Sequence, residues 1–331
     1  MERKIQCFGV RNYEIPYFKQ LAKKHNYELE LVPELISNDN RSIAYGNEAI
    51  MVRANCNLNK ESLQDLKDKG LKIILTRTVG YAHINPNDCK ELGIAYAYVP
   101  AYSPNAVAEL AVSLALMLNR SCHCMVNKVN HLDCKVYDNY FCKEIRNQTI
   151  GILGCGRIGM TAAKLFHGLG AKVIGYDVFK KESTDFIQMV ELEDLLKQAD
   201  IISIHMPYIK GKNDNYVNKE LISKMKNDVI IINTSRGEVV NEKDIIQAIK
   251  DNQIRSYGCD VITHEKQLFG KVLDKPTDDI HQQLISLFPR VIMTPHVGSA
   301  TDQALIGMIE TSLQNCDEYL KTGIPSNSLI K

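Results

Sequence analysis

The segment Thr149–Asp177, TIGILGCGRIGMTAAKLFHGLGAKVIGYD, constrains the fold of this chain more than any other. It contains an apolar strand, a glycine turn, a helix and a second apolar strand that ends in an acid. Gly154 permits the tight turn, Gly156 lets the backbone approach a pyrophosphate, and Gly159 lets the helix lie close to the sheet. The spacing predicts a βαβ unit that binds a dinucleotide, with its phosphates on the N–H groups at the helix start.

The acid at the end of this segment indicates which dinucleotide is bound. Asp177 closes the second strand, where a carboxylate accepts hydrogen bonds from the ribose hydroxyls and repels a 2′-phosphate. The segment therefore favours NAD over NADP. The alternative is a glycine turn in another kind of α/β protein. Arg157, just inside the helix, is either a phosphate neighbour or an ordinary solvated arginine.

Length and composition restrict the architecture and the partners. A chain of 331 residues is too long for one typical core, so two domains are expected. The net charge of +1 and the 45% hydrophobic content are those of an ordinary globular protein. No surface that seeks polyanions is expected, which disfavours nucleic acid and anionic membranes as partners.

The N-terminus and the cysteines favour a cytoplasmic protein. The first residues, MERKIQCFGV, lack the apolar region and cleavage site of a signal peptide, and no run of about 18 apolar residues follows. The ten cysteines are irregularly spaced, as expected for reduced thiols. No CxxC pair is present, and the Cys122-His123-Cys124 cluster lacks a second ligand pair, so no metal site is expected.

Apolar runs alternate with helical patterns through the first hundred residues. The predicted strands cover residues 4–10, 29–32, 49–52, 73–76 and 94–99, and a polar helix is predicted near 16–26. This pattern indicates a parallel α/β unit without a phosphate-binding motif of its own. The segment Pro100–Asn105, which contains two prolines, interrupts this pattern. A long apolar helix is predicted from there to about Leu118, and we interpret this helix as the crossing between two domains.

The second half of the chain repeats the alternation. After a polar segment at 120–146 and the dinucleotide unit, strands are predicted at 201–205, 229–233, 256–260 and 291–294, and an amphipathic helix at 301–320. We therefore predict an α/β protein with two Rossmann-like parallel-sheet domains. A discontinuous, flavodoxin-like substrate domain would comprise residues 1–101 and 299–331, and an NAD-binding domain, residues 102–298, would be inserted in it.

Three ionisable residues follow predicted strands of the second domain, at the edge where ligands bind in such sheets. They are Arg236 in NTSRGEVV, Glu265 in CDVITHE and His296 in TPHVGSA. Arginine offers a planar fork to a carboxylate, histidine exchanges a proton near neutral pH, and glutamate can orient the imidazole. Together, these three side chains are the groups needed to transfer a hydride between nicotinamide and a 2-oxo acid. Taken singly, each could instead be a solvated or structural residue.

Five motifs in order resemble the D-isomer-specific 2-hydroxyacid dehydrogenase family over essentially the whole chain. They are GCGRIG with Asp177, His205-Met206-Pro207, TSRG, CDVITHE and TPHVGSA. The resemblance implies that His296 protonates the keto oxygen, that Glu265 tunes it, and that Arg236 binds the substrate carboxylate. The implied cofactor-binding residues are Gly154, Gly156, Arg157, Ile158, Gly159, Asp177, His205, Met206, Pro207, Asn213, Thr234, Ser235, Arg236 and Asp260.

The resemblance also assigns roles in the first domain. The N–H groups of Val79 and Gly80 would bind the substrate carboxylate, and Tyr102 would lie over the substrate; a plain turn and a packed linker tyrosine are the alternatives. The chain departs from the usual pattern at TVGYAHIN, where Ala82 and Asn85 replace residues that are often acids or an amide. The family pattern further suggests a homodimer through the NAD domain, with the helix to about Leu118 at the interface.

The substrate hypothesis depends on Arg53, which ends the strand pattern IMVR. A cation there could bind a second carboxylate, or it could be a solvated residue at a strand end. The stretches FGVRNYEIP, MVRANCN, RTVGYAHI and KLFHGLGAKVIGYDVF resemble the branch with (R)-2-hydroxyglutarate and D-lactate dehydrogenases. We therefore expect reduction of 2-oxoglutarate with NADH. The alternatives are D-lactate or branched-chain hydroxyacid dehydrogenase activity and, from another class, an NAD-sensing corepressor.

Overall fold

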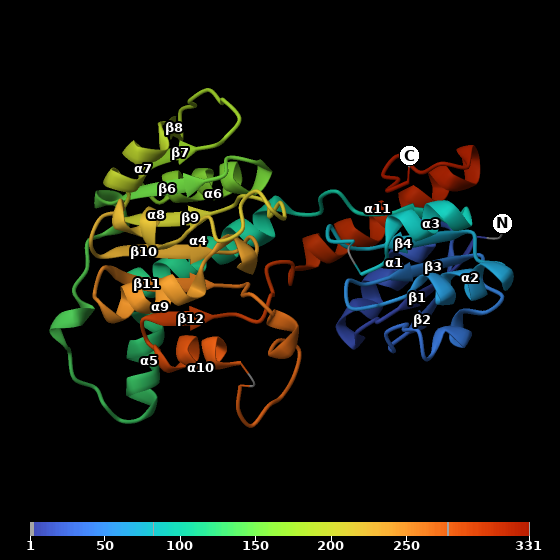
Figure 1. Cartoon of the computed structure of the whole chain (residues 1–331), viewed down its shortest axis with the longest axis horizontal. Coiled ribbons are helices and arrows are strands. Elements are labelled where there is room, and N and C mark those ends of the chain that lie inside the picture. Colours follow the sequence, from blue (N-terminus) through green and yellow to red (C-terminus); the bar gives the residue numbers. More distant parts are fainter. Residues whose placement is uncertain (1–2, 82, 277, 331) are drawn as a thin grey trace. The chain divides into compact units, whose positions relative to one another are not determined.

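The computed structural model describes residues 3–81, 83–276 and 278–330, and the chain divides into two compact units (Figure 1). The terminal unit comprises Met1–Ser103 and Ala300–Lys331, and the inserted unit comprises Pro104–Ser299. Both chain ends therefore belong to the terminal unit.

The terminal unit contains a five-stranded parallel sheet in the order β2-β1-β3-β4-β5. This order is flavodoxin-like and confirms the predicted fold of this unit. The strands are short, and β3 and β4 are buried at every position, as in sheets covered on both faces. Their bounds are β1 Lys4–Phe8, β2 Glu28–Val32, β3 Ala49–Val52, β4 Ile73–Thr76 and β5 Ala95–Ala97.

Helices cover both faces of this sheet. They are α1 Ile15–His25, α2 Lys60–Asp68, α3 Pro86–Leu92 and α11 Asp302–Thr322. On one face, Leu305, Ile309 and Leu313 of α11 pack with Phe18 of α1 and Ile5 of β1. The C-terminal helix α11 and the first strand β1 therefore belong to the same apolar core.

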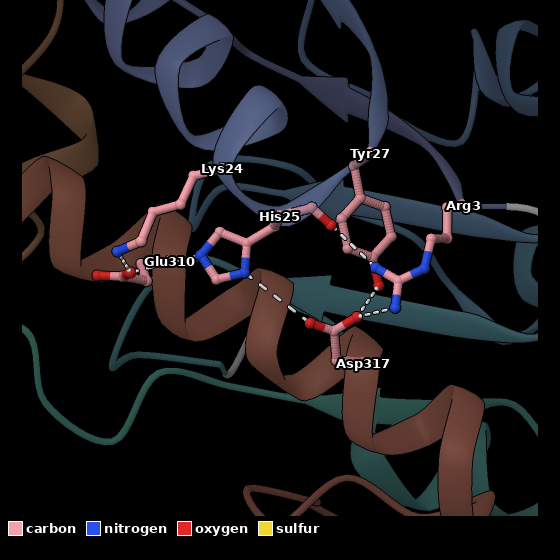
Figure 2. A network of polar contacts seen from close by, with 6 residues as sticks. All are labelled: Arg3, Lys24, His25, Tyr27, Glu310 and Asp317. Atoms are coloured by element: carbon pink, nitrogen blue, oxygen red, sulfur yellow. Dashed lines mark hydrogen bonds and ion pairs between the residues drawn. The ribbon is translucent and has the colours of Figure 1, made fainter.

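Polar contacts reinforce the packing of α11 on α1 and its neighbours. Figure 2 shows His25 between two carboxylates of α11, with its Nε2 3.4 Å from Glu310 and its Nδ1 3.9 Å from Asp317. Lys24 pairs with Glu310, while Arg3 lies 2.9 Å from Asp317. Arg3 and α1 are therefore joined to the last helix by charge, in addition to the apolar contacts.

The inserted unit contains a seven-stranded parallel sheet in the order β12-β11-β10-β9-β6-β7-β8. The order reverses between β6 and β9, which is the switch point of a Rossmann sheet and confirms the predicted fold class. The strands are β6 Thr149–Leu153, β7 Lys172–Tyr176, β8 Gln188–Met189, β9 Ile201–Ile204, β10 Val229–Asn233, β11 Ile254–Cys259 and β12 Val291–Met293. The helices are α4 Pro104–Asn119, α5 Cys122–Asn130, α6 Arg157–Gly168, α7 Leu192–Gln198, α8 Lys219–Ser223, α9 Glu242–Lys250 and α10 Asp279–Ser286.

The segment after α4 differs from its sequence prediction. Residues 120–146, described from the sequence as a polar segment with no predicted element, contain the helix α5. Only Cys124 of α5 is buried, whereas Val126 and Val129 are exposed, so the segment lacks the apolar periodicity that marks a helix in sequence. By contrast, α4 is buried along most of its length, and Leu114 and Leu118 pack against α6 residues such as Phe166.

Candidate active site

The glycine turn after β6 has the geometry that a dinucleotide requires. Gly154 has φ +93°, and a Cβ there would lie 2.7 Å from the backbone nitrogen of Met206. A Cβ on Gly159 would lie 2.0 Å from the carbonyl oxygen of Gly154. A Cβ on Gly156 would meet nothing within 4 Å, and no side chain caps the start of α6. The helix start is therefore open to a phosphate group.

Asp177 lies directly after β7, beside this turn. Its Oδ2 accepts a hydrogen bond from the N–H of Cys155 at 2.8 Å, and its Oδ1 accepts one from the N–H of Phe179 at 2.9 Å. A carboxylate has about four acceptor positions, so two remain for ribose hydroxyls. Arg157 is the first residue of α6, and Ile158 packs on the adjacent apolar core. These residues fit the adenosine and pyrophosphate of NAD.

The loop after β9 lies against the glycine turn. Nε2 of His205 lies 2.8 Å from the hydroxyl of Ser203, while burial lowers the pKa of His205 to about 4, so its ring is neutral near pH 7. The Asn213 side chain accepts from the N–H of Ile209 and donates to the carbonyl of Pro207, both at 2.7 Å. Asn213 therefore closes the His205-Met206-Pro207 loop.

Arg236 follows β10 in a turn that is organised by a buried asparagine. Oδ1 of Asn233 accepts hydrogen bonds from the N–H and the hydroxyl of Ser235, and its Nδ2 donates to the carbonyl of Arg236 at 2.9 Å. Arg236 is exposed, and Nη1 donates to the carbonyl of Ser235 at 2.6 Å. Thr234 is buried, and within the described part of the chain its hydroxyl has no hydrogen-bond partner. Asn233 was not among the site residues predicted from the sequence.

His296 and Glu265, predicted as a pair, are in direct contact. Nδ1 of His296 lies 2.7 Å from Oε1 of Glu265, which leaves Nε2 on the far side of the ring for a substrate. The hydrogen bond to Glu265 raises the pKa of His296, with a smaller contribution from the Asp260 charge. Burial and the positive charge of Arg236 oppose this rise. The guanidinium of Arg236 is therefore within electrostatic reach of the imidazole.

Asp260 holds the turn that carries His296. Its carboxylate accepts from the hydroxyl of Thr294 at 2.6 Å and from the N–H groups of Val297 and Gly298, both at 2.8 Å. Asp260 is only 1% exposed, and burial raises its pKa while these three bonds oppose the rise. The carboxylate thus supports the φ of +53° at His296, which is unfavourable for a residue with a side chain.

In the terminal unit, Arg53 directly follows β3. It is half-buried, and its Nη1 donates to the carbonyl of Gly9 at 3.2 Å. Burial and then the nearby charges of Arg11 and Arg77 lower the pKa of Arg53, and the negative charge of Glu14 partly opposes this fall. The carboxylate of Glu14 is committed to Arg77, at 3.0 and 3.1 Å. Among residues 3–81, 83–276 and 278–330, Arg53 forms no ion pair with a carboxylate.

The other predicted substrate residues also belong to the terminal unit. Val79 and Gly80 follow β4 in a turn that the Thr78 hydroxyl closes by donating to the carbonyl of Gly80 at 2.7 Å. The Tyr102 backbone packs on Gly307 of α11. Asn85 caps α3, since its side chain accepts from the N–H of Asn87 at 3.0 Å, and Ala82 lies outside the described residues. The structure thus brings Arg236, Glu265 and His296 together in one unit and places Arg53, Val79, Gly80 and Tyr102 in the other.

The Rossmann sheet, the open helix start and the acid after β7 define a dinucleotide-binding protein. Residues 112–298 match the family model described as D-isomer specific 2-hydroxyacid dehydrogenase, NAD binding domain. The chain belongs to the D-isomer-specific 2-hydroxyacid dehydrogenase family, as its motifs predicted. It is an NAD-dependent oxidoreductase that acts on 2-hydroxy acids.

Individual relatives cover nearly the whole chain. An aromatic 2-oxoacid reductase from Clostridium sporogenes is 36% identical over 99% of this chain and 99% of its own. A D-2-hydroxyacid dehydrogenase (NAD(+)) from Clostridioides difficile is 36% identical over 98% of this chain and 99% of its own. The crystal structure of a D-lactate dehydrogenase from Treponema pallidum superposes with a TM-score of 0.91, 30% identity, and 99% and 100% coverage.

Two further features concern metals and membranes. Within the described residues, no three histidine, cysteine or acidic side chains are arranged to hold a metal ion. In the same part of the chain, no helix combines the length and the apolar character needed to cross a membrane. All ten cysteines are free thiols.

Proposed function

We propose that this NAD-dependent dehydrogenase reduces 2-oxoglutarate to (R)-2-hydroxyglutarate. The observation that carries the proposal is the half-buried guanidinium of Arg53, which has no carboxylate partner among the described residues while Glu14 is committed to Arg77. Partial burial of a cation that forms no ion pair carries a desolvation cost, and an anionic ligand group offsets that cost. The distal carboxylate of 2-oxoglutarate is such a group.

The reacting end of the substrate is assigned to the inserted unit. Arg236 binds the first carboxylate and orients the carbonyl, because its planar fork matches a carboxylate. His296, held through Nδ1 by Glu265, donates the proton on Nε2 to the keto oxygen. NADH, held in the inserted unit, would supply the hydride for this reduction. In the reverse reaction the neutral imidazole accepts the proton from the hydroxyl.

The residues that would hold NAD surround the carboxyl ends of β6, β7, β9, β10 and β11. Gly154, Gly156 and the start of α6 at Arg157, Ile158 and Gly159 receive the pyrophosphate, and Asp177 receives the ribose. The nicotinamide end is assigned to the loops with His205, Met206, Pro207, Asn213, Thr234, Ser235, Arg236 and Asp260. In the terminal unit, the N–H groups of Val79 and Gly80 bind the substrate carboxylate and Tyr102 covers the substrate.

Steady-state reduction of a panel of 2-oxo acids with NADH tests the substrate. The proposal expects the highest kcat/KM for 2-oxoglutarate, compared with pyruvate, 2-oxoisocaproate and phenylpyruvate. A preference for any monoacid would overturn the role of Arg53 and leave the dehydrogenase assignment intact. An absence of turnover with every acid, together with tight NADH binding, would instead support an NAD-sensing protein.

We also propose that two copies of the chain associate through the inserted unit. The support is a set of exposed apolar residues on α5 and the segment after it, since contiguous exposed apolar surface marks sites of protein–protein contact. The set comprises Val126, Val129, Leu132, Val136 and Phe141. The helix expected at the interface is α4, which ends near Leu118; Leu118 itself is buried within the unit. Sedimentation of the wild type and of Phe141→Asp at equal concentrations tests this proposal: a monomeric wild type would refute it.

A further inference from the structure

Thr263, two residues before Glu265, is anchored by two buried side chains. Its N–H donates to Oε1 of Glu242 at 2.7 Å, and its hydroxyl donates to Oε2 of the same carboxylate at 2.5 Å. Its carbonyl oxygen accepts from Nε2 of His281 at 2.8 Å. Glu242 is 4% exposed and His281 is 1% exposed. The polar groups of Thr263 are thus satisfied by side chains from α9 and α10 rather than by its own loop.

Glu242 also belongs to the segment that carries Arg236. It is the first residue of α9, which follows the Arg236 turn after a single short 3-10 helix, Gly237–Val239. Gly237 lies so close to the neighbouring loop that a Cβ would be 2.1 Å from the carbonyl carbon of Ile262 and 2.4 Å from the nitrogen of Thr263. The two loops are therefore in backbone contact, and the carboxylate of Glu242 joins them.

This arrangement parallels the support of His296. Asp260, a buried carboxylate, holds the His296 turn by three hydrogen bonds. Glu242, a second buried carboxylate, holds the Glu265 loop by two hydrogen bonds. Burying a carboxylate is costly, and an apolar side chain of similar size would fill the same space without that cost. An apolar residue at position 242 could not form the two hydrogen bonds that hold Thr263.

We propose that Glu242 is a positioning residue: through Thr263 it holds the carboxylate of Glu265 against His296 and in register with Arg236. The inference rests on the proposed roles of Glu265 and His296 in reduction. Glu242 itself touches neither substrate nor cofactor. Because hydride and proton transfer need their groups placed to a fraction of an ångström, a loosened Glu265 loop reduces kcat more than it changes KM.

Three variants separate positioning from simple stability. Glu242→Leu removes both acceptors, and Thr263→Val removes only the hydroxyl donor. Glu242→Gln can keep both contacts, since its amide oxygen accepts from the N–H of Thr263 and its amide nitrogen donates to the hydroxyl. Glu220→Leu, at an exposed glutamate in the first turn of α8, is the matched control.

The primary measurement is the pH profile of kcat for reduction. We expect Glu242→Leu to lower kcat by roughly 10- to 100-fold and to move the alkaline decline to lower pH. Thr263→Val should show smaller changes in kcat and in the pH profile, in the same direction. Glu242→Gln should retain most of the wild-type kcat, and Glu220→Leu should have the wild-type kcat and pH profile. A folded Glu242→Leu protein with the wild-type profile would overturn the inference. If that variant does not fold, an unchanged profile in Thr263→Val overturns it instead.

A second measurement does not depend on turnover. The His296 ring protons can be titrated by NMR, with assignment from a His296→Gln variant. We expect Glu242→Leu and Thr263→Val to give a lower pKa for His296 than the wild type, because Glu265 is less firmly held. An unchanged titration overturns the inference. If the wild type reduces no 2-oxo acid, the proposed function fails, and this titration still decides whether Glu242 positions Glu265.

Discussion

Nδ1 of His296 lies 2.7 Å from the carboxylate of Glu265, and this contact raises the pKa of the imidazole. The protonated ring is the form that donates to a keto oxygen, so reduction declines as pH rises through the pKa of His296. Oxidation of the hydroxy acid has the opposite dependence, because it needs the neutral ring.

Replacing Glu265 with glutamine should therefore move the decline of the reductive rate to lower pH. We expect kcat/KM above neutral pH to fall by roughly 10- to 100-fold, since general acid catalysis contributes about 10²- to 10⁴-fold. The measurement is a pH series of NADH oxidation. Glu182→Gln, at an exposed glutamate after β7, is the control. A variant that loses rate equally at every pH would contradict the assigned role of the carboxylate.

The Arg53→Met variant should discriminate between diacid and monoacid substrates. A charge-assisted hydrogen bond contributes about 1.5–3 kcal/mol, so KM for 2-oxoglutarate should rise by about 10- to 100-fold. KM for pyruvate should change little. Arg11→Met, which removes an exposed guanidinium near Arg53, controls for a general loss of positive charge. Equal increases for both substrates would refute a specific contact with the distal carboxylate.

Asp177→Asn should weaken the discrimination between NADH and NADPH. The asparagine removes the negative charge that repels a 2′-phosphate, and its remaining oxygen can accept only part of the present hydrogen bonds. We expect the ratio of Kd for NADPH to Kd for NADH, measured by fluorescence titration, to fall by about tenfold or more, equivalent to about 1.4 kcal/mol. Asp185→Asn, exposed in a nearby loop, should leave the ratio unchanged.

Two glycines on α6 offer a matched pair of substitutions. Gly159→Ala places a Cβ 2.0 Å from the carbonyl oxygen of Gly154, so the helix and the turn must separate. We expect a loss of about 1–3 kcal/mol of stability and weaker NAD binding. Gly168→Ala, at the end of α6, meets nothing within 4 Å and should stabilise the protein by about 0.4–1 kcal/mol, chiefly because it restricts the unfolded chain. Thermal unfolding and NADH titration of both variants provide the comparison.

The glycine turn and the buried strands could be predicted because their signals are local. Gly154, Gly156, Gly159 and Asp177 stand at the spacings of a dinucleotide-binding βαβ unit. Arg236, Glu265 and His296 could be singled out because each follows an apolar strand, and parallel strands bring their carboxyl ends to one edge.

The supporting residues could not be predicted in this way. Asn233, Glu242 and His281 look like ordinary polar residues in sequence, and their importance depends on contacts between segments far apart in the chain. The place of Asp260 near the nicotinamide stays a prediction, and the three hydrogen bonds that its carboxylate accepts from the turn of His296 could be found only in the structure. The helix α5 was missed because its apolar side chains face outward.

The position of α11 affects the order in which this protein can fold during synthesis. Leu305, Ile309 and Leu313 complete the apolar core around β1 and α1, yet they leave the ribosome only after the entire inserted unit. Until then, α1 alone covers this face of the N-terminal strands, while the Rossmann sheet forms. In a circular permutant that begins at Ala300, α11 would be synthesised immediately before β1. The sheet of the terminal unit should then form earlier in translation.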